Sequence, residues 1–580
     1  MLINNLMKNL FKILFLVSFL IIHATLFAQS KKKKKVIKKA VTEKSNSIKK
    51  NTTSTYDKVN FDSTKPNLLT ITSTFKPFLK GASKINFTAA TPSLDTNRIS
   101  LAYNIPAQNL FFTYQPVPIK PIAYNSELNR DWGNASYIKL GFGNYTKPYV
   151  ETALSFGDAK TTLFNVFANY RNSKGSVLYQ ENTAAQLQVS AAVNTIANHD
   201  FVATLNYQLS NQNKYGTNPN FVFTKDQLSQ NFNTINANFV LHSKNANEFG
   251  IKYHPTLNTS FFSDNHQATE TSILFDAPIE KKISKNISVD LRLLADISSY
   301  KINSTSISNN IFVIAPRINY QDDDLTISAG IQPTWNNSEV EMLPNISAEY
   351  KLAKEKFSLL AGLKSYYQKN TYKSLVSQNP FIDQPLSFNN TKTAEIFGGI
   401  KGAVGKHFSF NGKLSFLNYT NFVLFANDTA TSKSQNFNVL NEPNLKAIKI
   451  GGEISYTNQE KFNFVTSVSF TQFTSQEKYD KVFGYLPLEI TSSLRYMLLK
   501  DVYLKSELFI WDGANYRVKN NITGKAKMAI DFNLGTEVKV IKNTYFYLEF
   551  NNLFNNVYQR WNQYDVFGFN VVAGVVYSLH

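Results

Sequence analysis

The sequence predicts an all-β fold: one large closed antiparallel transmembrane β-barrel of about 22 strands, with short periplasmic turns and long extracellular loops. Three observations predict it. The 580-residue chain is 14% aromatic and 18% charged and contains no cysteine, which excludes a disulfide scaffold, a thiolate metal site and a cysteine nucleophile. Segments of roughly 9 to 14 residues alternate between apolar and polar positions. Short and long connections alternate between those segments.

The first 28 residues have the pattern of a secretory signal peptide. Lys8 and Lys12 supply a positive region, Ile13–Ile22 is a short apolar run, and Ala28 is a small residue at the expected cleavage point. A membrane anchor is the alternative, but a spanning helix needs about 20 apolar residues. We therefore expect cleavage after residue 28 and export of the mature chain.

Two segments separate this signal from the predicted barrel. Residues 29–60 form a basic tail, because positions 31–50 hold ten lysines and one glutamate out of a net charge of +20. We expect a flexible linker, with a contact to anionic lipid or cell-wall polymer as the alternative. Residues 61–130 carry six prolines between residues 77 and 121, which favour extended backbone. This segment either fills the lumen or contacts a periplasmic partner.

Residues 131–580 are expected to form the barrel. In Asn286–Ser298, one face holds Ile287, Val289, Leu291, Leu293, Ala295 and Ile297. The opposite face carries Asp290, Arg292 and Asp296. A period of two indicates strands with one apolar face. His407–Asn418 and Asp501–Trp511 repeat the pattern, with Lys413, Lys505 and Glu507 on the polar face of their strands.

The connections predict two different rims. Tight turns are expected at Gly157–Ala159, Tyr320–Asp324, Lys354–Lys356, Gly405–Lys406, Asn458–Glu460, Lys500–Asp501 and Lys542–Asn543. Longer polar stretches are expected at Asn211–Gln230, Lys369–Thr391, Asn421–Leu445 and Asp512–Lys525. Tight periplasmic turns and long outer loops are typical of outer-membrane barrels.

A closed sheet satisfies the physical demand of lipid, where every backbone polar group must be paired within the protein. A soluble propeller is the main alternative, but it needs a repeat of about 40 to 50 residues, and the sequence has none. Aromatic girdles support the barrel. Tyrosines expected near strand ends are Tyr149, Tyr170, Tyr207, Tyr253, Tyr366, Tyr367, Tyr485, Tyr496, Tyr545 and Tyr547.

The C-terminal region resembles the end of a TonB-dependent receptor barrel. The residues that carry the resemblance are Asn552, Leu553, Phe554, Asn555, Asn556, Val557 and Tyr558, then Gly568 and the alternating final strand. One face of that strand holds Phe567, Phe569, Val571, Ala573, Val575, Tyr577 and Leu579. The resemblance implies that this strand is read by the barrel assembly machinery of a Gram-negative outer membrane. The family usually ends in Phe, whereas this chain ends in His580.

The chain departs from the family at its N-terminal end. Family members carry a substantial plug preceded by a segment that pairs with TonB, and here residues 61–130 stand in that place. Leu68–Phe75 either mimics the TonB-pairing strand or forms a short edge strand. The resemblance implies TonB, or a periplasmic or surface protein, as a partner, beside outer-membrane lipid and lipopolysaccharide.

The sequence predicts no catalytic, metal or cofactor site. Its seven histidines lack ligand spacing, neither a phosphate-binding loop nor a Gly-x-Ser-x-Gly elbow occurs, and Asp322–Asp324 reads as a solvated turn rather than a calcium site. The charge outside the tail is mild, so no nucleic-acid partner is expected. Asp290, Arg292, Asp296, Lys413, Lys505 and Glu507 either line a polar lumen or pair with one another or with the N-terminal segment.

These observations predict a transport protein that carries a solute across the outer membrane. The alternative is a non-transport scaffold for a secretion, adhesion or surface-protein complex, and an outer-membrane enzyme comes third. The long outer loops are expected to hold the specificity.

Overall fold

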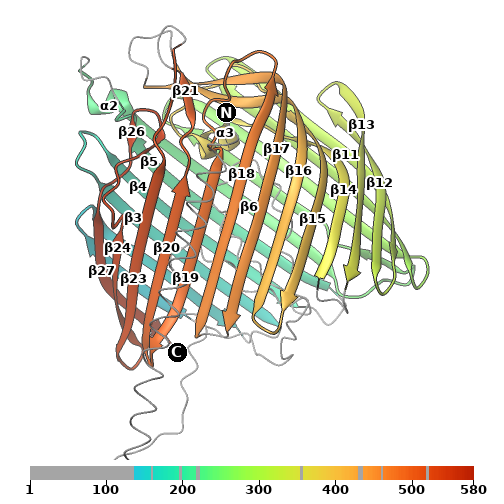
Figure 1. Cartoon of the computed structure of the whole chain (residues 1–580), viewed down its shortest axis with the longest axis horizontal. Coiled ribbons are helices and arrows are strands. Elements are labelled where there is room, and N and C mark those ends of the chain that lie inside the picture. Colours follow the sequence, from blue (N-terminus) through green and yellow to red (C-terminus); the bar gives the residue numbers. More distant parts are fainter. Residues whose placement is uncertain are drawn as a thin grey trace, which may run out of the picture. The chain divides into compact units, whose positions relative to one another are not determined.

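The fold is a closed antiparallel β-barrel (Figure 1). The computed structural model describes residues 136–579 except 158–160, 195–198, 217–221, 353–356, 429–434, 459–460 and 518–521. The predicted signal peptide, the basic tail, Leu68–Phe75, the rest of residues 61–130 and residues 131–135 lie outside the described residues. The first half of the barrel consists of β1 (Ser136–Gly143), β2 (Thr146–Gly157), β3 (Thr162–Lys174), β4 (Glu181–Asn194), β5 (His199–Asn213), β6 (Ser229–Ser243), β7 (Ile251–Tyr253), β8 (Thr256–Asp264), β9 (Ala268–Lys282), β10 (Ile287–Ile302), β11 (Thr305–Gln321) and β12 (Leu325–Asn336).

The second half continues the same up-and-down order. It consists of β13 (Glu339–Leu352), β14 (Phe357–Gln368), β15 (Thr391–Val404), β16 (Phe408–Asn427), β17 (Phe437–Asn458), β18 (Phe462–Gln476), β19 (Leu488–Leu499), β20 (Val502–Trp511), β23 (Ala529–Ile541), β24 (Thr544–Asn551) and β27 (Asn570–Leu579). Short elements in the connections are α2 (Lys225–Leu228), α3 (Tyr372–Gln378), β21 (Asn515–Arg517), β22 (Thr523–Lys525), β25 (Gln559–Trp561) and β26 (Tyr564–Asp565).

Twenty-two crossings close the barrel, which confirms the predicted strand number. The sheet contains 23 strands because β7 and β8 are two parts of one crossing, both paired with β9. The interruption falls at His254–Pro255, where proline has no N–H for the ladder. The ring closes where β27 pairs with β1, from Ser136↔Leu579 to Gly143↔Val572. The last strand is therefore the closing strand.

The two rims differ, as the connection lengths predict. The seven predicted tight turns all lie at one rim, between β2 and β3, β11 and β12, β13 and β14, β15 and β16, β17 and β18, β19 and β20, and β23 and β24. The long connections lie at the other rim, where Figure 1 shows α2, α3, β21 and β26 at the upper end of the barrel. We call these the short-turn rim and the loop rim.

The predicted polar loop Asn421–Leu445 is wrong. β16 continues to Asn427 and β17 begins at Phe437, so the described turn residues between them are only Asp428, Gln435 and Asn436. Phe422–Ala426 is fully apolar and buried. It lacks alternation because loops cover both of its faces, and a strand buried on both faces shows no period of two.

The strand faces alternate between an apolar outside and a polar inside. On β1, Ile138, Leu140 and Phe142 are 36%, 51% and 64% exposed, whereas Lys139 between them is 1% exposed. This pattern repeats around the ring and forms the apolar belt that lipid requires. Among the described residues, no helix is long and apolar enough to cross a membrane.

Only some of the tyrosines that were expected at the membrane interfaces are exposed, and others are buried inside the protein. Tyr170, Tyr207 and Tyr496 are exposed, but Tyr149, Tyr485, Tyr545 and Tyr547 are buried. Tyr547 lies under the Lys139 ammonium group, 4.1 Å from the nitrogen to the ring centre. Gly141 makes room for it, because a Cβ there would lie 1.9 Å from the Tyr547 hydroxyl oxygen. The interface assignment of these buried tyrosines is wrong. Inward register buries Tyr149, Tyr545 and Tyr547, whereas Tyr485 lies in the β18–β19 connection and packs against Phe422 and Phe425.

Candidate functional site

The inner wall holds the six charged residues that the sequence singles out. All six lie on the strand face opposite the exposed apolar residues. Five form ion pairs: Asp290 with Arg317 (2.5 Å), Arg292 with Asp276 (2.7 Å), Asp296 with Lys369 (2.5 Å), Lys413 with Glu395 (2.7 Å), and Lys505 with Glu537. Glu507 on β20 lies opposite Asn533 of β23. Four of these pairs join neighbouring strands, and Asp296 pairs with Lys369 of the β14–β15 connection. Ion pairs therefore make this wall polar.

The loop between β14 and β15, residues 369–390, lies at the loop rim and carries the short helix α3 (Figure 1). Thr371 caps the N-terminus of α3 in a capping box. The Ser374 backbone N–H donates to the Thr371 side chain, and the Thr371 backbone N–H donates to the Ser374 side chain. The Tyr372 hydroxyl donates to Asp264 (2.7 Å), and Lys373 Nζ donates to Asn236 and Ser260 (both 2.6 Å). Burial lowers the pKa of Lys373. The helix is therefore tied to the inner side of β6 and β8.

Asparagine side chains hold both ends of this loop. Asn390 Nδ2 donates to Asn309 Oδ1 (2.7 Å) and to Asn336 Oδ1 (2.6 Å). Asn309 Nδ2 donates to the Asn370 carbonyl (2.9 Å), and the Asn370 amide N–H donates to Asn390 Oδ1 (3.0 Å). These hydrogen bonds join residues at the start and end of the loop to β11 and β12, so this buried polar cluster fixes where the loop leaves and re-enters the wall, although Asn370 Oδ1 has no hydrogen-bond partner.

One hydrophobic core joins loops that are remote around the ring. The Phe381 ring, which follows α3, stacks on Tyr564 of β26 with centroids 3.5 Å apart. Tyr215, from the β5–β6 loop, meets both rings edge-on. Phe437 of β17 packs on Trp561 with centroids 5.4 Å apart. We call the loops that share this core the loop layer, and they meet across the mouth of the barrel.

Backbone bonds reinforce the loop layer. Phe437 N–H donates to the Phe381 carbonyl and Asp383 N–H donates to the Phe437 carbonyl, both at 3.0 Å. The Tyr564 hydroxyl donates to the Gln435 carbonyl (2.7 Å). Segments from the β14–β15, β16–β17 and β24–β27 connections are thus hydrogen-bonded to one another rather than only to their own strands. Sequence reasoning missed this layer, although the unbroken apolar run Phe422–Ala426 was a signal of it.

The family-like motif forms the turn that begins the β24–β27 connection. Asn552 and Asn555 have φ of 48° and 49°, in the left-handed region that asparagine tolerates. Asn552 Nδ2 donates to the carbonyls of Asn556 (2.9 Å) and Phe567 (3.0 Å), and Asn556 N–H donates to Asn552 Oδ1 (2.9 Å). The Asn555 Oδ1 accepts from Phe569 N–H (2.8 Å). The motif therefore sets the start of the closing strand.

The remaining motif residues pack against neighbouring strands and turns, and the predicted assembly strand has one exposed and one buried face. Tyr558 donates to Asp531 (2.9 Å), and Phe554 stacks on Phe532 (5.7 Å between centroids). Phe567 precedes β27 and stacks on Tyr145 (5.7 Å). Residues of the predicted outer face with exposed side chains are Phe569, Val575 and Tyr577, whereas Val572, Val576 and Ser578 are buried on the inner face. Val571 and Leu579 are half-buried.

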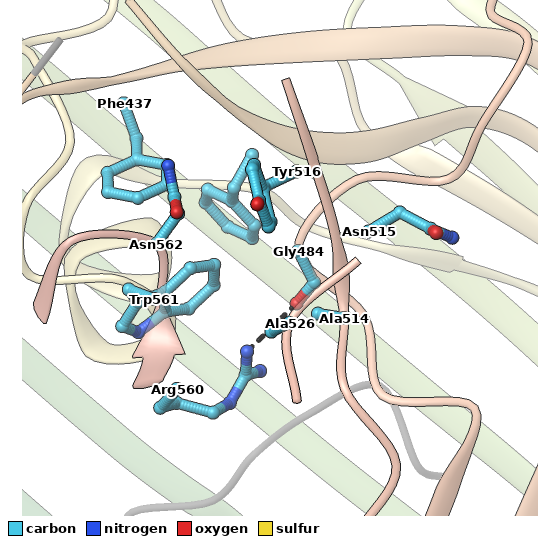
Figure 2. A pocket seen from close by; sticks show the side chains of 10 residues that line it. Phe437, Gly484, Ala514, Asn515, Tyr516, Ala526, Arg560, Trp561 and Asn562 are labelled. Carbon is cyan, nitrogen blue, oxygen red and sulfur yellow. Dashed lines mark hydrogen bonds between the residues drawn. The ribbon is translucent and has the colours of Figure 1, made fainter. Parts of the chain in front are cut away.

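A small pocket lies within the loop layer (Figure 2). Phe437, Tyr516 and Trp561 supply aromatic walls, and Asn515, Asn562 and Arg560 supply polar groups. Figure 2 shows Arg560 directed at Gly484, where Nη1 donates to the carbonyl (3.1 Å). Exclusion of water by the surrounding protein lowers the pKa of Arg560 to about 10. The cavity volume is about 10 Å³, room for about one water molecule and far below the roughly 300–1,000 Å³ typical of ligand pockets.

Solved structures share this architecture. The FrpB iron transporter from Neisseria meningitidis is 11% identical with a TM-score of 0.59, over 78% of this chain and 82% of that one. The siderophore receptor PirA from Acinetobacter baumannii is 9% identical with a TM-score of 0.60, over 77% and 80%. The pyoverdine outer-membrane receptor FpvA from Pseudomonas aeruginosa is 11% identical with a TM-score of 0.60, over 78% and 79%.

The chain has the barrel fold of TonB-dependent outer-membrane receptors. No family model matches its sequence, and no curated protein matches it. A closed barrel of this fold with an apolar outer belt belongs in the outer membrane of a Gram-negative bacterium. In such a barrel the short-turn rim is periplasmic and the loop rim is extracellular.

Proposed function

We propose that the barrel carries a solute across the outer membrane. The polar, ion-paired inner wall of a 22-strand ring is the observation that supports this function, because a ring of this size has an interior that must be either filled or conducting. The structural neighbours are transport receptors rather than enzymes, which supports a non-enzymatic role. The six inner charged residues are then lumen-lining residues.

We further propose that residues 61–130 fill the lumen from the periplasmic side, while the loop layer covers the extracellular mouth. Transport then requires both covers to move. In this proposal Leu68–Phe75 is the segment that contacts TonB, and the final strand, Phe567–Leu579, is the segment recognised by the barrel assembly machinery. Solutes of the neighbours, an iron species for FrpB and pyoverdine for FpvA, are the first compounds for an uptake test.

Conductance in planar bilayers tests the proposal with four forms of the mature chain. These are the full chain, a form lacking residues 29–130, a loop-layer variant with Phe381→Ala and Tyr564→Ala, and the combination. We expect steady channels only from the combination, since either cover alone closes the path. A conducting full chain would contradict the two-cover arrangement. A silent combination that is correctly folded would contradict transport.

A scaffold for a secretion, adhesion or surface-protein complex is the second candidate. The observation that favours it is the continuous buried core of the loop layer, because closely packed aromatic rings at the mouth leave no opening for a solute. A folded but silent combination form, together with a partner protein that co-purifies in fixed ratio, would establish it. Loss of growth-dependent uptake on removal of TonB would instead establish energised transport.

A further inference from the structure

Two histidines face each other on the inner wall of the barrel, close to the short-turn rim. His242 is the last residue but one of β6, and His254 lies between β7 and β8. Val240 of β6 pairs with Thr256 of β8, and the same register two positions further on places His242 opposite His254. Thr256 in turn pairs with Asp276, an ion-paired residue of the inner wall. Because side chains two positions apart share a strand face, both histidines lie on the polar face.

The two imidazole rings converge through one nitrogen each. Nδ1 of His242 lies 2.6 Å from Nδ1 of His254, and the ring centroids are 4.7 Å apart at an interplanar angle of 64°. A neutral imidazole has one N–H, which either ring nitrogen can carry. When both rings carry that hydrogen on Nε2, two Nδ1 lone pairs point into the same space. We call these two residues the histidine pair.

The spacing of the histidine pair is close to that of two ligands on one metal ion. Imidazole nitrogens bind zinc at about 2.0–2.1 Å, and two of them in tetrahedral positions are then roughly 3.3 Å apart. His254 is exposed and His242 is half-buried, so small side-chain rotations suffice to open the Nδ1–Nδ1 distance by a few tenths of an ångström. A dication can therefore take the place of the shared hydrogen without any change in the strands.

The surroundings leave the choice of ion to the nitrogen ligands rather than to charge. Three acidic and three basic side chains flank the histidine pair, as ion pairs or strand partners: Asp200 with Lys244 (3.0 Å), Asp276 with Arg292 (2.7 Å), and Glu280 with Lys252. Among the described residues, no group of three or more His, Cys, Asp or Glu could hold a metal ion, so water completes the coordination. Imidazole suits zinc, copper and nickel, whereas calcium and magnesium prefer oxygen ligands.

We propose that His242 and His254 bind a transition-metal dication of the Zn²⁺ or Cu²⁺ class at the periplasmic end of the inner wall. The bound ion joins β6 to the segment between β7 and β8, where Pro255 interrupts the strand. This inference is independent of the solute that the barrel carries. The twelve positions between the two histidines match no ligand spacing of a helix or a tight turn, and only the pairing of the strands brings the rings together.

Cu²⁺ binding by the full mature chain in detergent, purified with a tag that contains no histidine, tests this site. Pulsed EPR spectroscopy counts the coordinated imidazoles, and competition with Zn²⁺ compares the two ions. The test variants are His242→Gln, His254→Gln and both together. The matched control is His266→Gln with His407→Gln, two exposed histidines outside the pair. The chain has no cysteine, so no thiolate competes for the ion.

We expect the wild type and the control to bind one Cu²⁺ through two imidazoles. Each single test variant should bind at least about tenfold more weakly, since even changes to groups around a metal ligand weaken binding about 10–100-fold, and the double variant should lose the site. Acidification should release the ion, because the ligands must be neutral.

Three results would overturn the proposal. These are a wild type whose Cu²⁺ has fewer than two coordinated imidazoles, a double test variant that binds as tightly as the wild type, and a control that loses as much affinity as the test variants. Heat-modifiable gel mobility shows which variants are folded. The imidazole count of the wild type decides the question even if a variant fails to fold, since it needs no substitution.

Discussion

At the residue scale, asparagine side chains hold connections of this protein in place by hydrogen bonds, a role that disulfides or metal ions have in other proteins. Asn552 is buried and joins Asn556 to Phe567, and Asn390 joins the neighbouring strands β11 and β12 to the α3 loop. Both use a side-chain carboxamide, whose NH₂ group donates while its carbonyl oxygen accepts. The sequence analysis identified the motif around Asn552, but it did not predict the hydrogen-bond partners of this side chain across the turn.

We predict that Asn552→Ala destabilises the closing strand. The change removes three hydrogen bonds at a buried site, where each unsatisfied group costs about 1–3 kcal/mol, and places alanine at a positive φ, which costs about 1–2 kcal/mol. Asn552→Gly removes the same bonds without the backbone cost. Urea unfolding in vesicles should therefore rank wild type above Gly and Gly above Ala. Equal stability of all three would refute this role of the side chain.

At the element scale, the α3 loop belongs to the mouth rather than to its own hairpin. Its helix has only seven residues, too few to be stable alone. Tertiary partners hold it: the ion pair of Lys369 with Asp296, the Tyr372–Asp264 bond and the Phe381–Tyr564 stack. Sequence reasoning expected a polar loop here and could not see which distant rings would meet Phe381.

We predict energetic coupling between Phe381 and Tyr564. Stacked aromatic pairs contribute about 0.5–1.5 kcal/mol beyond the area they bury. A double-mutant cycle with Phe381→Ala and Tyr564→Ala, read by hydrogen exchange of residues 369–390, should give a coupling of that size. Phe554→Ala with Tyr564→Ala is the control, because Phe554 packs on Phe532 instead. Additive effects of Phe381→Ala and Tyr564→Ala would contradict a stabilising contact between the two rings.

At the scale of the whole molecule, successive residues of each barrel strand face opposite sides, one toward lipid and the next toward the polar interior. Ile346 on β13 is 44% exposed on the outer face, and Ser347 beside it faces Ser328 and Gly362 on the inner face. Period-two alternation made this separation readable from the sequence, since a shift of one residue moves a side chain to the other face.

We predict opposite tolerance to arginine at these two neighbours. Ile346→Arg puts a charge in hydrocarbon, which costs about 2–4 kcal/mol near the bilayer midplane. Ser347→Arg puts the same charge on the inner wall, between Ser328 and Gly362, and we expect a cost below about 1 kcal/mol. Folding into vesicles of defined lipid measures both. A larger loss for Ser347→Arg would reverse the assignment of the two faces.

The sequence by itself determined the barrel, its strand number, its two unlike rims and the faces of its strands, because these follow from local alternation and the length of each connection. Only the tertiary structure decided how the mouth is covered. The loop layer depends on contacts between residues such as Phe381 and Tyr564, which are nearly two hundred positions apart, and no local period records such a meeting. The same reason explains the Asn421–Leu445 error, since burial on both faces removes the alternation that marks a strand.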